Sequence, residues 1–235
     1  MADVNPSVNP AFNPDTALLG RLRSDPSSWE ELVSFSPIDT SDAESDSNLS
    51  NRMQAMLALH ADHFHCPDPE LGPPREDEAL VAYLLSQEIR LHQHFDGMRP
   101  ALNLACFLMA RYRKPAYVWA VWAAKNSGPY DVFVCVDILY LYYTAGGVNA
   151  ARKYVEACTL EDVLEGAQQG GAWEGWWSHT VDADGGDAAE AFCVEQTSLL
   201  QRIDRDRRTL SDEHVVRFIS SPLRSDTKNW AALLL

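Results

Sequence analysis

The fold of this chain is most constrained by long segments in which apolar residues recur every three or four positions. Each of these segments ends at proline or glycine. One segment places Met53, Met56, Leu57 and His60 on one side, and the clearest has a stripe of Leu80, Tyr83, Leu84, Gln87, Leu91, His94 and Phe95. Such spacing is typical of amphipathic helices. No Asn-Gly hairpin signal separates the segments. We therefore predict an all-α fold, a compact stack of antiparallel helix pairs.

The helices of this stack are bounded by capping residues, prolines and glycines. The predicted ranges are 48–64, 76–95, 100–113, 115–126, 148–157, 160–168, 188–208 and 211–219. The range 131–144 is rich in β-branched and aromatic residues, and a strand competes with a helix there. Its length before Gly146 favours a helix, because strands usually span about five or six residues.

The first part of the chain differs in composition from the rest. Residues 1–47 are rich in Asn, Pro, Ser and Asp, and little in them can be buried. We expect a mobile, partly disordered acidic arm, with short helices at 14–23 and after Ser28. Residues 48–235 are expected to form a single helical domain.

The charge of the chain excludes several classes of function. Asp and Glu number 34 against 19 Lys and Arg, a formal charge of −15, and residues 1–100 carry 17 acidic and 6 basic residues. Nucleic acids and anionic lipids attract basic surfaces, so neither is an expected partner. The first residues resemble no targeting signal, which favours a cytoplasmic location. Of the five cysteines, Cys106, Cys135 and Cys193 have apolar neighbours and are expected to be buried.

A segment without helical periodicity, residues 169–187, carries a candidate binding site for a protein partner. Long loops of this kind are often functional. Its tryptophans suggest either a plug over the core or an exposed platform, so the segment is buried or exposed in these two alternatives. The candidate partner-binding residues are Trp173, Trp176, Trp177, Asp182 and Asp184.

Histidines form an alternative candidate site, for zinc or iron. Five of the seven histidines fall between residues 60 and 94, with Asp62 and Asp96 nearby. Imidazole and carboxylate groups are common ligands of both metals. Residues two apart on a helix point in different directions, so at most one histidine of His63 and His65, and one of His92 and His94, can face a common ion. A plausible set is His60, His63 and His94, with Asp96 at the end of the helix. Without such a site, no cofactor is expected.

No standard catalytic motif is present, which favours a binding protein over an enzyme. In size, acidity and helix content the chain resembles bacterial immunity proteins and other acidic inhibitors of basic toxins, although it shares no motif with them. The resemblance implies binding and modulation of a basic protein partner. Two alternatives stay open: a metal-dependent hydrolase or oxygenase at the histidines, and a scaffold subunit that oligomerises through the aromatic helices of 100–143.

Overall fold

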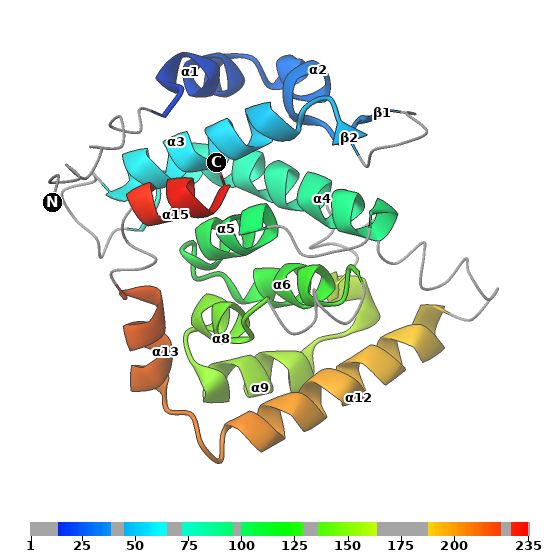
Figure 1. The fold of residues 1–235 in the computed structure, drawn as a ribbon. Coiled ribbons are helices and arrows are strands. Elements are labelled where there is room, and N and C mark those ends of the chain that lie inside the picture. The colour runs from blue at the N-terminus through cyan, green and yellow to red at the C-terminus, as the bar shows by residue number, and fades with distance from the viewer. Residues whose placement is uncertain are drawn as a thin grey trace, which may run out of the picture.

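A computed structural model describes residues 14–38, 45–64, 72–95, 100–128, 136–163, 188–221 and 227–234. These ranges are mostly helical, with one short pair of strands, so the predicted all-α class is confirmed. The helices lie in successive layers, from α1 and α2 at one side of the molecule to α9 and α12 at the other (Figure 1).

The first layer is built from the residues that were expected to form the arm. Helix α1 (Thr16–Ser24) begins where Asp15 accepts a hydrogen bond from the Leu18 amide, and α2 (Trp29–Val33) follows a 3-10 turn. Strands β1 (Pro37–Ile38) and β2 (Ser45–Asp46) are antiparallel, with Pro37 opposite Asp46.

Side chains of this layer belong to the main hydrophobic core. Leu19, Leu22 and Val33 are buried in the same cluster as the helices that follow. The expected boundary at residue 47 therefore does not separate an arm from a domain, because residues 14–38 pack against the body of the protein. The error came from composition: a few well-spaced apolar residues suffice to dock two short amphipathic helices.

The centre of the molecule consists of five helices: α3 (Leu49–Phe64), α4 (Glu78–His94), α5 (Pro100–Ala110), α6 (Val118–Lys125) and α8 (Leu139–Ala145). Every residue of α6 is buried, and so is nearly all of α5. For the range 131–144, the sequence allows either a strand or a helix. Residues 139–145 form helix α8, which ends at Gly146 in the left-handed conformation. Residues 131–135 lie outside the described ranges.

The last layer contains α9 (Val148–Ala157), the long α12 (Ala188–Asp206) and α13 (Asp212–Ile219). Helix α12 packs on α9, and α13 packs on α8 (Figure 1). A final helix that we did not predict, α15 (Thr227–Leu234), returns to α3 and α5, where Trp230 is buried. The predicted range 160–168 is helical over its described part, 160–163.

Helix α9 receives its N-terminal cap from a distant residue. It begins after Gly147, which has a φ of +132° and no side chain to cap the helix. Asp212, at the start of α13, accepts a hydrogen bond of 2.8 Å from the Val148 amide. An oxygen acceptor at this position stabilises the first turn, so α13 supplies the cap that the local sequence lacks.

Two further observations bear on the sequence predictions. None of the helices in the described ranges combines the length and apolarity that crossing a bilayer requires. Cys106 is buried as expected, whereas Cys193 is exposed, because it lies on the outer face of α12. The apolar neighbours of Cys193 misled the prediction, since in a helix adjacent residues point in different directions.

Candidate functional site

Helices α3 and α4 lie antiparallel and hold the two main polar clusters of the described chain. Arg52 of α3 contacts Glu88 of α4, and His63 of α3 contacts Asp77 at the start of α4. The two clusters therefore lie near opposite ends of the helix pair. We call them the Arg52 cluster (Asp46, Arg52 and Glu88) and the Asp77 cluster (Arg23, Asp62, His63 and Asp77).

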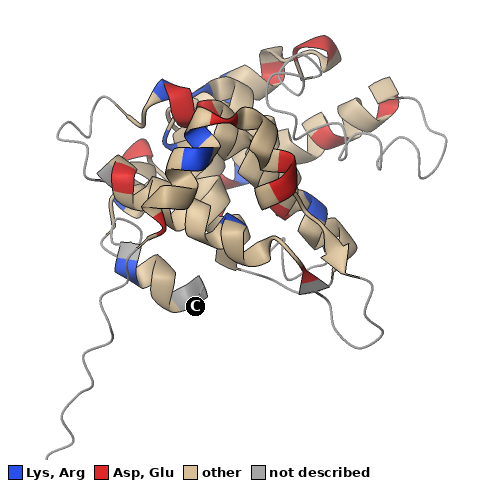
Figure 2. Cartoon of the chain, turned by 90° about the horizontal axis from the view of Figure 1, so that it is seen from above, with Lys and Arg blue, Asp and Glu red and all other residues tan. Residues whose placement is uncertain are grey.

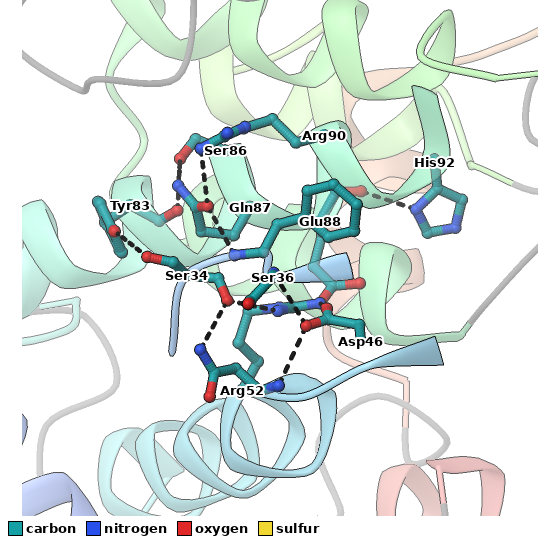
Figure 3. Close-up of polar contacts among 12 residues, drawn as sticks. Ser34, Ser36, Asp46, Arg52, Tyr83, Ser86, Gln87, Glu88, Arg90 and His92 are labelled. Atoms are coloured by element: carbon teal, nitrogen blue, oxygen red, sulfur yellow. Dashed lines mark hydrogen bonds and ion pairs between the residues drawn. The ribbon is translucent and has the colours of Figure 1, made fainter. Parts of the chain in front are cut away.

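The Arg52 cluster consists of one cation and two carboxylates, all buried (Figure 3). Arg52 Nε donates to Glu88 Oε1 at 2.8 Å, and Arg52 Nη2 lies 2.5 Å from Asp46 Oδ2. Burial acts to lower the pKa of the guanidinium, yet its pKa is raised because Glu88 and Asp46 favour the charged form. The two carboxylates thus stabilise the buried cation of Arg52.

Backbone groups of the β1–β2 region attach to the same cluster. Asp46 Oδ1 accepts hydrogen bonds from the amides of Ser36 and Asn48, at 3.1 and 3.0 Å. The carbonyl of Ser34 accepts from Arg52 Nη1, and Gln87 Oε1 accepts from the Phe35 amide at 2.9 Å (Figure 3). These bonds join the segments around β1 and β2 to α3 and α4. Their effect is structural, because satisfied polar groups fix one arrangement of the chain.

The Asp77 cluster ties α1 to the same helix pair at its other end. Arg23 of α1 donates two hydrogen bonds to Asp77, Nε to Oδ1 at 2.7 Å and Nη2 to Oδ2 at 2.6 Å. Arg23 Nη2 also donates to Asp62 at 2.5 Å, and His63 Nε2 lies 3.1 Å from Asp77 Oδ2. Burial acts to raise the pKa of Asp77, but the hydrogen bonds from His63 and Arg23 lower it below its ordinary value.

The His63–Asp77 pair has the arrangement in which a carboxylate orients an imidazole. Because an ionised carboxylate only accepts, His63 Nε2 is the donor to Asp77, and Nδ1 has no hydrogen-bond partner among the described residues. Both side chains are completely buried, and the ring packs edge-on against Tyr112. A general base must reach its substrate, so this burial favours a structural role for the pair.

The structure does not bring the predicted metal ligands together. His60 packs against the rings of Phe107 and Trp230, while His94 packs on Phe35 and Phe95. Asp77, the contact of His63, precedes His94 by 17 residues, which is about 25 Å along a helix. Asp96 lies outside the described ranges. Within those ranges no group of three His, Cys, Asp or Glu residues is arranged to hold a metal ion.

The predicted partner-binding residues lie outside the described part of the chain: Trp173, Trp176, Trp177, Asp182 and Asp184. The alternative oligomerisation surface, the aromatic helices of 100–143, includes α5 and α6. Helices α5 and α6 bury almost all their side chains in the core, including Trp119 and Trp122. Trp122 Nε1 even donates to Glu195 of α12 at 2.8 Å, so these helices offer little surface to another subunit.

The distribution of charge separates the described helices from the segments that connect them. The described residues contain 20 acidic and 17 basic side chains, and both signs are mixed over the helices (Figure 2). The remaining residues of the sequence contain 14 acidic and 2 basic side chains. Of the net charge of −15, a share of −12 therefore belongs to the connecting and terminal segments.

Comparison with known proteins finds no matching family model, no matching curated protein and no matching solved structure. The sequence analysis missed five of the seven members of the two clusters: Arg23, Asp46, Arg52, Asp77 and Glu88. One signal was available: Glu88 lies four residues after Leu84 on the apolar stripe of α4, where a charge requires a buried partner. The identity of that partner, 36 residues earlier, is not visible in periodicity.

Proposed function

We propose that the protein is a non-catalytic binding protein that engages and modulates a basic protein partner, in the manner of an acidic inhibitor. The observation that carries the proposal is the charge partition between helices and connections. The described body is nearly neutral, most of the negative charge belongs to the other segments, and negative charge steers and holds a surface of opposite charge.

The segment 164–187 is the strongest candidate for the contact. Its sequence contains five acidic residues and no basic residue, together with Trp173, Trp176 and Trp177. Tryptophan is enriched among the residues that dominate binding energy, and acidic residues around it would select a basic partner. The neighbouring body supports this division of roles, because the Arg52–Glu88 and His63–Asp77 pairs are closed to solvent and serve to hold the helices in place.

A titration with a basic probe tests the proposal. The probe is a fluorescently labelled peptide of 20 residues rich in Lys and Arg, added to the full chain at low salt. In one variant, Glu174→Gln, Asp182→Asn and Asp184→Asn remove three charges from the segment. A matched variant, Glu31→Gln, Glu76→Gln and Glu161→Gln, removes three exposed charges from the described helices.

The two variants have the same net charge and separate local binding from general attraction. We expect the segment variant to bind the peptide at least about fivefold more weakly than the wild type, and the helix variant to bind within about twofold of it. Equal losses in both variants would contradict the proposal. A natural partner recovered from cell lysate must in turn be basic, and its recovery must fall in the segment variant alone.

A further inference from the structure

The outer face of α12 is an uncharged strip between two exposed charges. Glu190 lies near the start of the helix and Arg205 near its end, about 22 Å apart. The side chains between them on this face are Cys193, Val194, Thr197, Ser198 and Gln201, which with Glu190 line an open groove of about 440 Å³. The opposite face packs on the core through Phe192, Leu199 and Ile203.

Val194 makes this strip unusual among the described surfaces. Its side chain is 62% exposed, more than that of Val216 or Ile38, the other large hydrophobic residues exposed in the described ranges. The side chains that line the strip between Glu190 and Arg205 are uncharged, and these two flanking charges have opposite signs. A basic partner would gain nothing from it, so the strip is distinct from the acidic segments of the proposed function.

The order of residues along the strip is self-complementary. If a second α12 runs antiparallel about a point between Thr197 and Ser198, Val194 of one copy lies opposite Gln201 of the other. The same operation places Glu190 opposite Arg205 at both ends of the contact. Neither of these two residues has an ion pair within the described part of the chain. A two-fold symmetric dimer requires this kind of self-complementary patch.

We propose that the outer face of α12 is the interface between two copies of this chain, packed antiparallel. The small side chains at the centre allow the two helix backbones to approach closely, and the contact removes Val194 of both copies from water. A single pair of helices buries less surface than a standard interface, so the dimer is weak and depends on protein concentration. The inference does not rest on the proposed function.

Sedimentation equilibrium of the full chain tests the interface over about 5–500 µM protein. The wild type is expected to show a monomer–dimer equilibrium that weakens as salt is raised. Glu190→Arg alone and Arg205→Glu alone each place like charges opposite one another twice per dimer. Each should raise the dissociation constant at least about fivefold, and the double variant should restore it to within about twofold of the wild type.

Two further variants complete the test, one within the strip and one control outside it. Val194→Glu places a charge in the apolar part of the strip and should abolish the dimer over the same range. Glu213→Arg reverses an exposed glutamate on α13, outside the strip, and should leave the dissociation constant unchanged. A wild type that stays monomeric throughout, a double variant no better than the singles, or an equal effect of Glu213→Arg would overturn the proposal. Circular dichroism verifies that each variant is folded.

Discussion

Arg52 and Glu88 are 36 residues apart in the sequence, yet their side chains form an ion pair of 2.8 Å from Nε to Oε1 with no exposure to solvent. The pair joins α3 to α4, and Asp46 adds a second carboxylate from β2. A buried cluster of this kind gives little net stability over an apolar one, but removing one member leaves uncompensated charge. This asymmetry can be measured.

Replacement of Arg52 by Met should destabilise the protein by about 3–5 kcal/mol, because Asp46 and Glu88 would then be buried without a cation. Urea unfolding followed by circular dichroism measures this loss. Adding Asp46→Asn and Glu88→Gln to Arg52→Met removes the remaining charges and should recover part of the stability. A triple variant less stable than Arg52→Met would show that the charges themselves are not the cause.

Acidification should weaken the Asp77 cluster. The folded state holds the pKa of Asp77 below its unfolded value, so the stability it contributes is present above about pH 4 and is lost as pH falls through the lower, folded pKa. Asp77→Asn should cost about 2 kcal/mol at pH 7. The difference in unfolding free energy between wild type and variant should shrink between pH 5 and pH 3. A constant difference over this range would count against the prediction.

Lys125 should give a dependence of the same sign, a stability that rises with pH, but in the alkaline range. Its side chain is 4% exposed, its Nζ donates to the Val136 carbonyl at 2.6 Å, and burial, assisted by Arg202, lowers its pKa to about 8. Between pH 8 and about 10 the unfolded state therefore holds more protons than the folded state. Stability should rise with pH in this window.

Lys125→Met removes the titrating group and serves as the comparison. Urea midpoints measured at pH 7, 8, 9 and 10 should rise less steeply in the variant than in the wild type. The window stops near pH 10 because burial also raises the pKa of Tyr142, and tyrosine ionisation then favours the unfolded state. Parallel curves for both proteins would refute the assignment to Lys125.

Two adjacent glycines provide a matched pair for the junction of α8 and α9. Gly146 has a φ of +88° with open space where a Cβ would lie, so Gly146→Ala should cost about 1–2 kcal/mol from backbone strain alone. At Gly147 the φ is +132°, and a Cβ would lie 2.5 Å from Cγ of Asp212. Gly147→Ala should therefore cost more than Gly146→Ala in thermal unfolding. Equal melting temperatures would show that Asp212 moves freely.

Periodicity predicted most of the described helices, because an amphipathic helix buries one face and its apolar residues therefore recur every three or four positions. It missed α15, whose two turns carry too short a repeat, and it assigned α1 and α2 to an arm because polar residues dominate around Leu19 and Leu22. The polar clusters escaped for another reason. Arg52 and Glu88 belong to different helices, and their pairing depends on how those helices pack.

The cap of α9 has a consequence for how the chain is assembled. Asp212 lies 64 residues after Val148, whose buried backbone amide donates a hydrogen bond to it. During synthesis at about 5–20 residues per second, α9 must wait roughly 3–13 seconds before its cap has been made. In a ribosome-bound chain that ends before α13, the first turn of α9 lacks this hydrogen-bond acceptor. The junction of α8 and α9 is therefore completed late in translation.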